Sequence, residues 1–216
     1  MTQTRYYDQG WPLVYWASQV EVVCPNCGKS ALVTGSPLGR NFHGVFSCPH
    51  CQHHLDTKVD DWQSVWAGFG RQPCQKCGYQ WVEASQFYEN RAAIANQYGQ
   101  GTCPNCQTVN QIELSFRQWE PSHHAVDPYF GLDLALVEPT RLGNIWVYNA
   151  AHLNELKLYT EAFLREGGLR SSGYFSRLPG WIKSAKNRRL VLKAIGRLQA
   201  RTQTSIDDFV PALSLK

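Results

Sequence analysis

The fold is decided by Cys24-Pro-Asn-Cys27, Cys48-Pro-His-Cys51, Cys74-Gln-Lys-Cys77 and Cys103-Pro-Asn-Cys106, four segments that contain all eight cysteines of the chain. In each segment two residues separate the cysteines, which lets both thiolates project from one tight turn onto one metal ion. A second pair from elsewhere in the chain completes a tetrahedral four-sulfur site. The chain therefore carries the ligands for two such sites.

The spacing along the chain predicts which pairs share an ion. Between successive pairs lie 20, 22 and 25 residues. Sequential pairing gives two consecutive zinc ribbons, whereas an interleaved, cross-braced pairing needs longer loop closures. We expect two structural Zn²⁺ ions, although spacing alone leaves iron open. The predicted metal ligands are Cys24, Cys27, Cys48 and Cys51 in the first ribbon, and Cys74, Cys77, Cys103 and Cys106 in the second.

Other cysteine chemistries fit this chain less well. The opening Met1-Thr-Gln-Thr-Arg-Tyr-Tyr-Asp8 is polar and lacks the apolar segment of a secretory signal peptide. We therefore expect a reducing, cytoplasmic location, where such a pattern favours metal over disulfides. Dithiol redox chemistry normally uses one pair beside a βαβ unit, and this chain has four pairs. No apolar run approaches the ~20 residues that span a bilayer, so we expect no membrane association.

The charge of the chain is unevenly distributed. Residues 1–140 carry 8 Lys and Arg against 12 Asp and Glu, whereas residues 141–216 carry 13 against 5. Four thiolates and one divalent ion add a formal charge of about −2 per site, which makes the ribbon half more acidic still. Ribbons that bind nucleic acid are expected to carry Lys and Arg around their knuckles to neutralise phosphates. These ribbons carry few.

Local patterns predict a β-rich first part. Residues 5–23 are rich in aromatic and β-branched side chains, which favours an extended segment, and residues 41–47 have the pattern of a strand. Gly28, directly after the first pair, is able to supply a positive φ. Residues 85–98 have apolar side chains near helical spacing and predict a helix inserted in the second ribbon. The alternation in residues 112–116 predicts a strand.

The last third of the chain has a different pattern. Residues 132–137 and 145–148 predict two strands of a hairpin. Asn149 is a good N-cap for a following helix that ends at Gly167-Gly168. A second, amphipathic helix is expected from Trp181 to about Arg201.

Together these patterns predict an α+β fold, in which two consecutive four-cysteine zinc ribbons, rich in β structure, precede a β-hairpin and two C-terminal helices. We expect three segments: a first zinc ribbon with an aromatic N-terminal segment over residues 1–62, a second zinc ribbon with the inserted helix over 63–128, and the hairpin with a helical module and basic last helix over 129–216.

The predicted last helix is strongly basic. No acidic residue occurs from Gly167 to Ile206, where nine Lys and Arg residues lie. One interpretation is a solvated face on a helix that docks through its opposite side, including a docking onto the acidic ribbon half. The other is contact with nucleic acid or an acidic partner, with Trp181 and Tyr174 nearby for stacking. The candidate contact residues are Lys183, Lys186, Arg189, Lys193 and Arg197.

Three segments carry a resemblance to a known family. The ribbons resemble those of bacterial TFIIB-type zinc-ribbon proteins, and Cys74-Gln-Lys-Cys-Gly-Tyr-Gln-Trp-Val-Glu-Ala-Ser85 is similar to a broad class of zinc ribbons. Trp146-Val-Tyr-Asn-Ala-Ala-His-Leu153 and Arg177-Leu-Pro-Gly-Trp-Ile-Lys-Ser-Ala-Lys-Asn-Arg188 resemble a C-terminal module that accompanies such ribbons. The likeness covers most of the chain, and the cysteine pairs are its specific motifs. It implies zinc and a style of fold, and it transfers no activity.

The sequence favours an interaction protein over an enzyme. It contains no phosphate-binding loop, hydrolase nucleophile motif or metalloprotease motif, and a closed four-thiolate site offers no open coordination position. His50, His53 and His54 are therefore expected to be surface groups. We expect the acidic ribbon half to recognise a basic protein, as in an immunity-type antagonist of a bacterial toxin. The alternative is a nucleic-acid-binding zinc-ribbon protein that uses the basic C-terminal helix.

Overall fold

The structure of the 216-residue chain is a computed structural model. It describes thirteen β-strands and four α-helices within residues 5–37, 43–119, 125–166 and 173–209, with side chains as far as Thr202. The predicted α+β class is confirmed. No helix in the described part of the chain has the length and apolar character that a membrane crossing requires.

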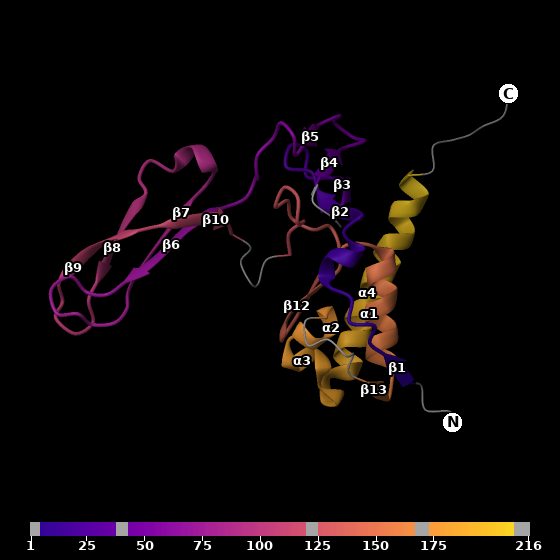
Figure 1. The fold of residues 1–216 in the computed structure, drawn as a ribbon. Coiled ribbons are helices and arrows are strands. Elements are labelled where there is room, and N and C mark those ends of the chain that lie inside the picture. Colours follow the sequence, from indigo (N-terminus) through magenta and orange to yellow (C-terminus); the bar gives the residue numbers. More distant parts are fainter. Residues whose placement is uncertain (1–4, 38–42, 120–124, 167–172, 210–216) are drawn as a thin grey trace. The chain divides into compact units, whose positions relative to one another are not determined.

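The chain forms two compact units (Figure 1). Unit 1 contains residues 1–59 and 125–216, and unit 2 contains residues 60–124. The first and last of the three segments expected from the sequence therefore belong to one unit. Each unit contains one set of four cysteines.

In unit 1 the first ribbon is a four-stranded antiparallel sheet in the order β2-β3-β4-β5. One cysteine pair lies in the turn between β2 and β3, and the other in the turn between β4 and β5. The strand predicted over 41–47 is β4, although Asn41 and Phe42 lie outside the described residues. The strands are β2 (Gln19–Val23), β3 (Ser30–Ser36), β4 (His43–Ser47) and β5 (His54–Asp56).

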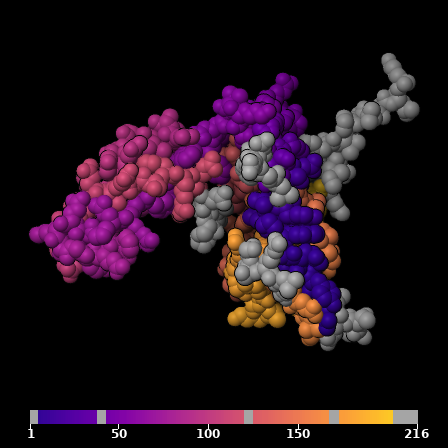
Figure 2. Space-filling view, in the orientation of Figure 1, coloured from indigo at the N-terminus to yellow at the C-terminus, as the bar shows by residue number. Residues whose placement is uncertain are grey.

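The rest of unit 1 is mostly helical, with two small pairs of strands. The antiparallel hairpin is β11 (Val137–Thr140) with β12 (Gly143–Trp146), and β1 (Arg5–Tyr7) pairs in parallel with β13 (Leu164–Glu166). The helices are α1 (Ala150–Glu161), α2 (Tyr174–Arg177), α3 (Gly180–Lys183) and α4 (Arg188–Phe209), with 3-10 helices η1 (Leu13–Trp16) and η3 (Ala185–Asn187). In Figure 2 the N-terminal segment, in indigo, lies on the surface of this unit.

The predicted hairpin is present, but its strands lie closer to the turn than expected. The first strand begins and ends later and the second begins and ends earlier, because Glu138, Pro139 and Thr140 pair with Ile145, Asn144 and Gly143. The turn is therefore Arg141-Leu142, and most of the residues assigned to the connection belong to the strands.

The first ribbon and the helices share one hydrophobic core. The edge of β2 that does not pair with β3 bonds to the segment that follows unit 2 in the chain. The Glu21 N–H donates to the Tyr148 carbonyl at 2.9 Å, and the Glu21 carbonyl accepts from the Ala135 N–H at 3.0 Å. Asn149 extends this connection, because its Nδ2 donates to the carbonyls of Trp16 and Gln19 at 2.8 and 2.7 Å. These bonds position the apolar side of the ribbon against α1 and α4.

The predicted first helix is α1, and its N-cap is confirmed: the Asn149 Oδ1 accepts from the His152 N–H at 2.9 Å. It ends at Glu161, earlier than predicted, and the expected stop at Gly167-Gly168 lies outside the described residues. Two arginines bond to carbonyls at or near this helix end. Arg165 donates to the Thr160 carbonyl at 3.1 Å and Arg188 donates to the Ala162 carbonyl at 3.0 Å, which supplies donors that the end of a helix lacks.

The prediction of one continuous helix from Trp181 to Arg201 is wrong. The chain instead forms α3, η3 and then α4, with Ser184 in an extended conformation at φ −72° and ψ 127°. The buried Asn187 side chain donates to the Trp181 carbonyl at 2.9 Å. This side-chain bond satisfies a carbonyl near the end of α3 and supports the break in the helix.

Unit 2 is a pair of small sheets that meet across a glycine-rich interface. One sheet has the order β10-β6-β7, and the other pairs β8 with β9. A Cβ at Gly70 would lie 2.1 Å from the Glu113 carbonyl oxygen, so only glycine permits this approach. The strands are β6 (Trp66–Gln72), β7 (Val82–Tyr88), β8 (Tyr98–Thr102), β9 (Val109–Glu113) and β10 (Ser115–Gln118).

The helix predicted over residues 85–98 is wrong. Residues 82–88 form β7, and every residue of this strand pairs with a residue of β6. Val82 and Ala84 alternate into the core of unit 2. Only a short 3-10 helix, η2 (Arg91–Ala93), follows it. The long-range pairing with β6 outweighs the helical spacing of the apolar side chains, because strand formation depends mainly on cross-strand context.

Candidate metal centres

The eight cysteines form two compact four-sulfur clusters, and the sequential pairing predicted from their spacing is confirmed. In each cluster the sulfur atoms lie within 4.8 Å of one another. Cys24 and Cys51 are 3.6 Å apart, as are Cys27 and Cys48, and the closest contacts in unit 2 are 3.6 and 3.7 Å. A tetrahedral site with metal–sulfur bonds of about 2.3 Å has edges of about 3.8 Å. The clusters therefore have the dimensions of metal sites, and their sulfurs are too far apart for disulfides.

All four cysteine pairs lie in turns of the same backbone geometry. In each turn the N–H of the residue after the second cysteine donates to the carbonyl of the first, at 2.9 to 3.0 Å. That residue has a positive φ in every case, which is 69° at Gly28 and Gly78 and 59° at Gln52 and Gln107. The expected role of Gly28 is thus confirmed, and the same position recurs in the other three turns.

Because Gly78 and Gln107 have the same positive-φ conformation, substitutions at these two positions are expected to change the stability of unit 2 in opposite directions. A Cβ at Gly78 meets no atom within 4 Å, so Gly78→Ala changes only the backbone preference. We expect it to destabilise unit 2 by about 1 kcal/mol, because an L-residue is strained at positive φ. Gln107→Gly relieves the same strain and is expected to stabilise the unit by up to about 1 kcal/mol. Urea unfolding of the zinc-loaded protein measures both, and equal stability of the two variants would contradict this account.

Asparagine side chains support the sulfurs in both clusters. Asn105 Nδ2 lies 3.6 Å from the Cys77 sulfur, and Asn26 bonds in the same way to Cys51. Each asparagine precedes the second cysteine of one pair and donates to the second cysteine of the other pair. The Cys-Pro-Asn-Cys repeat is the signal in the sequence that identifies this role, which sequence reasoning missed.

Asn110 has no such signal and was also missed. It is 1% exposed, its Oδ1 accepts from the Gln75 N–H at 2.9 Å, and its Nδ2 lies 3.7 Å from the Cys74 sulfur. This buried amide joins the two turns of unit 2, as a second-layer donor to a metal ligand commonly does.

The electrostatics of the clusters suit a cation. Hydrogen bonding by the Asn26 side chain lowers the pKa of Cys51 to about 6, and the backbone N–H of Cys77 lowers that of Cys74 to about 6. Burial raises the pKa of the Cys103 thiol to about 11. The lowered pKa values favour the thiolate forms of Cys51 and Cys74. Cys103 needs a nearby positive charge to ionise, and a bound metal ion supplies that charge.

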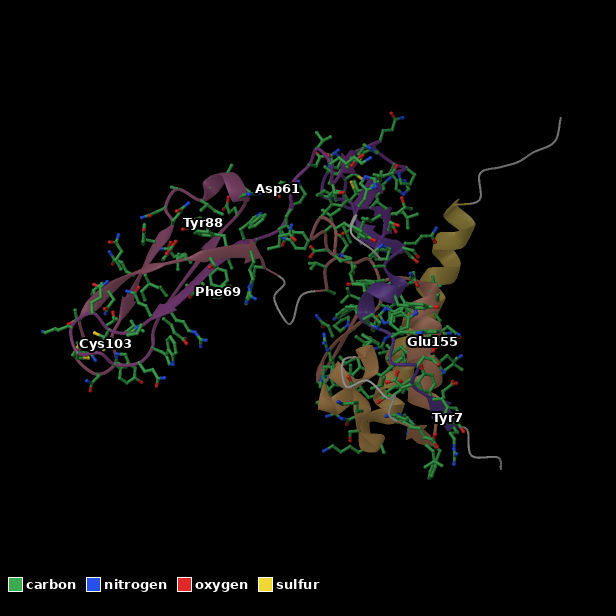
Figure 3. All side chains as sticks on the ribbon, viewed as in Figure 1. Tyr7, Asp61, Phe69, Tyr88, Cys103 and Glu155 are labelled. Carbon is green, nitrogen blue, oxygen red and sulfur yellow. The ribbon has the colours of Figure 1, made fainter. Side chains whose placement is uncertain are left out.

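Each cluster has a complete tetrahedral ligand set. In the described residues, no other group of three or more His, Cys, Asp or Glu side chains is close enough to hold a metal. His50 and His54 are exposed, and His53 lies against the Phe46 ring at 5.5 Å. His123 and His124 lie outside the described residues. Figure 3 shows Cys103 at the end of unit 2 far from Tyr88 and Asp61.

The structure separates the predicted basic contact residues. Lys183 donates to the Ser176 carbonyl at 3.0 Å, and Arg197 forms an ion pair with Glu138 of β11, as does Arg201. Lys186, Arg189 and Lys193 are exposed and have no bonded partner among the described residues. Two cations of α4 therefore bond to Glu138 of the β11-β12 hairpin within unit 1.

A surface on unit 2 was not foreseen from the sequence. Val82 and Ala84 are buried, so alternation places Phe69, Phe87 and their neighbours on the opposite, solvent-facing side of the β6-β7-β10 sheet. The rings of Phe69 and Phe87 each contact the Trp119 ring, at 5.4 and 5.3 Å between centroids. Phe87 is 55% exposed. The pairing of β6 with β7 brings the Phe69 and Phe87 rings together on this side of the sheet.

Comparison of the chain with protein-family models, with curated proteins and with solved structures finds no match.

Proposed function

We propose that this chain is a non-catalytic zinc-binding interaction protein and that unit 2 recognises a basic protein partner. The two clusters support the first part, because four thiolates saturate a tetrahedral zinc ion and leave no position for a substrate or activated water. Zinc fits better than a hard cation, because thiolate ligands select soft or borderline metals. The resemblance to bacterial TFIIB-type zinc-ribbon proteins stays a prediction that the cysteine pairs support.

The observation that carries the proposal is the solvent-facing side of the β6-β7-β10 sheet. It contains a groove of about 640 Å³ whose lining includes Phe69, Glu83 and Glu113. The one cation among the described residues of this lining, Arg71, lies over the Trp81 ring at 4.6 Å. Neither glutamate has an ion-pair partner among the described residues. The neighbouring Arg117 lies over the Phe69 ring at 4.8 Å, so this ring already accepts a guanidinium. Two available carboxylates beside an aromatic ring suit a lysine or arginine side chain of a partner.

The charge of unit 2 supports the same partner chemistry. Residues 60–124 carry four Lys and Arg against six Asp and Glu, and a zinc-loaded cluster adds about −2. A basic toxin that acts on nucleic acid fits this surface, because an acidic face neutralises a cationic groove and speeds association. In that case the chain is an immunity-type antagonist.

Affinity purification with mass spectrometry tests the proposal. We expect zinc-loaded protein to recover a basic protein from nuclease-treated lysate, and E83Q/E113Q to recover at least about tenfold less, because both carboxylates of the groove lose their charge. E89Q/E161Q is the matched control, since both glutamates are exposed and lie outside the groove. Equal recovery by the two variants, or partners that all disappear with nuclease, would contradict the proposal.

A second candidate function is nucleic-acid binding by unit 1. The observation that favours it is the exposure of Lys186, Arg189 and Lys193, which have no bonded partner among the described residues. Arg197 is less available than the sequence suggested, because it shares the Glu138 carboxylate with Arg201. Tyr174 is 8% exposed and is too buried to stack with a base. Trp181 remains accessible and leads to the inference below.

A further inference from the structure

The cations of unit 1 divide into two groups according to their bonds. Arg165, Arg188 and Lys183 each donate to a backbone carbonyl, and Arg197 and Arg201 bond to Glu138. These five side chains are therefore bonded to other parts of unit 1. Arg141 and Lys186 belong to the other group, because they are exposed and have no bonded partner among the described residues.

Arg141 and Lys186 lie on the same pocket. It has a volume of about 660 Å³ and lies between the turn of the β11-β12 hairpin and the segment from α3 to η3. Its lining contains Trp181 and Ser184 but no acidic residue. Two positive charges on one cavity, with no counter-charge among its described lining residues, create a local potential that attracts an anion.

The aromatic wall of this pocket is held in place. Trp181 packs against the core of unit 1, and a Cβ added at Gly143 would lie 3.3 Å from its ring. The hairpin backbone therefore approaches the indole closely. Asn187 fixes the same segment by donating to the Trp181 carbonyl at 2.9 Å. A half-buried indole that is supported in this way presents a stacking surface with little loss of side-chain entropy.

We propose that this pocket binds a nucleotide unit, with its phosphate between Arg141 and Lys186 and its base against Trp181. A guanidinium binds two phosphate oxygens at once, and an ammonium adds a point charge. A planar base gains ~1 to 3 kcal/mol by stacking on an aromatic ring. The Ser184 hydroxyl supplies a further hydrogen-bonding group. Carboxylate metabolites fit less well, because they leave the indole unused.

The nucleotide unit has two sources, a free nucleotide or a single strand of nucleic acid. Arg189 and Lys193 bear on this choice. Both are exposed on α4, one helical turn apart and therefore on one side of the helix. They are available to neighbouring phosphates of a strand, whereas a free nucleotide does not need them. In Figure 2 the segment around α3, in orange to yellow, is visible on the surface of unit 1.

Fluorescence anisotropy of the full, zinc-loaded chain tests the pocket. The probes are a labelled mononucleotide and labelled single-stranded DNA and RNA of about 12 nucleotides. We expect R141Q/K186Q to weaken binding by at least about tenfold, because charge-assisted bonds to phosphate are lost. R177Q/K58Q is the matched control: it removes the same charge from exposed side chains outside the pocket and is expected to change binding less than about twofold.

Trp181→Leu tests the stacking separately, and circular dichroism checks that the variant is folded. A mononucleotide is expected to displace the labelled probe from the wild type at lower concentration than ribose 5-phosphate, which has no base. In the Trp181→Leu variant the two competitors are expected to displace the probe at equal concentrations. Binding of the mononucleotide identifies a free nucleotide as a ligand. Binding of strands alone, with an affinity that falls steeply between 50 and 200 mM salt, identifies nucleic acid.

The proposal is overturned if none of the probes binds at 50 mM salt, or if R141Q/K186Q and R177Q/K58Q bind alike. The inference does not depend on the protein partner of unit 2, because E83Q/E113Q, the variant that tests that partner, changes residues of the other unit. Failure of one proposal is therefore distinguishable from failure of the other.

Discussion

Replacement of Cys103 by serine is expected to release one of two zinc ions and to unfold unit 2. Cys103 is fully buried, and the core cluster of unit 2 in the described residues has only six buried members. Structural zinc contributes an apparent ~10–16 kcal/mol in zinc-finger peptides, whereas whole domains are stable by only ~5–15 kcal/mol. The bound ion is therefore the main source of stability in this unit. Elemental analysis and hydrogen exchange of residues 66–118 measure both effects.

Cys24→Ser is expected to release one ion as well, with a smaller structural effect. The first ribbon shares a core cluster of thirty buried residues with α1 and α4, so burial continues to stabilise unit 1 without its metal. We expect a lower melting temperature with most helical circular dichroism retained. The sequence by itself treats the two ribbons as equivalent, and this asymmetry comes from the structure.

Thr102→Ser is the control for both cysteine variants, because Thr102 is exposed and adjacent to Cys103. It should bind two zinc ions and melt like the wild type. The two-site account fails if the wild type contains a single ion, or if metal-free protein melts at an unchanged temperature.

The second large effect is expected at Gly44. Gly44 of β4 lies opposite Gly35 of β3, and the Tyr129 ring covers both. A Cβ would lie 2.5 Å from Tyr129 Cγ at Gly44 and 2.4 Å from its Cζ at Gly35. The ring has no room to move, because Tyr129 is 4% exposed and its hydroxyl donates to the Ala17 carbonyl at 2.8 Å. Gly44→Ala is therefore expected to destabilise unit 1 by about 3 kcal/mol.

The backbone next to Tyr129 is fixed as well. The buried Asp127 carboxylate accepts from the N–H groups of Tyr129, Phe130 and Leu132 at 2.8, 2.9 and 2.6 Å. A clash at Gly44 consequently has to move this loop or separate β3 from β4. Neither adjustment is small, which supports the magnitude expected for Gly44→Ala.

A double-mutant cycle measures the clash directly by urea unfolding. In the background of Tyr129→Ala the two closest ring atoms, Cγ at 2.5 Å and Cδ1 at 2.6 Å, are gone and the Cβ at 2.8 Å remains. Gly44→Ala should therefore lower the free energy of unfolding clearly less in this background than in the wild type. Gly196→Ala is the matched control, because a Cβ there meets no atom within 4 Å on the exposed side of α4. It should stabilise the protein by about 0.5–1 kcal/mol. Equal effects of Gly44→Ala in both backgrounds would exclude the clash.

Local features of the fold were predictable from the sequence. The metal ligands and their pairing follow from the cysteine spacing, because each turn is formed by a few consecutive residues. The cap of α1 at Asn149 is local in the same way. No neighbouring residue explains why Gly35 and Gly44 occur inside strands. A glycine in a strand often marks a place where another group approaches the backbone closely, but the sequence does not identify that group, which here is the Tyr129 ring.

The errors arose where distant contacts compete with local preference. Residues 85–98 have helical spacing, but β7 forms because β6 offers a full set of strand partners. The basic helix breaks at Ser184, where the Asn187 side chain bonds to the Trp181 carbonyl. The groove and the aromatic cluster of unit 2 could not be foreseen, because they depend on which strands are neighbours and which face is buried.

By itself the sequence determined the two four-sulfur clusters, the β-rich ribbons around them and the capped helix, because turns, strand alternation and caps depend on residues close together in the chain. Only the tertiary structure decided that the first ribbon shares a core with the C-terminal helices, since the edge of β2 has to find residues 133–135 more than a hundred positions away. It also decided which cations are available. A lysine or arginine is available to a partner only if the fold gives it no carbonyl or carboxylate of its own, and within the described part of the chain this holds for Arg141 and Lys186.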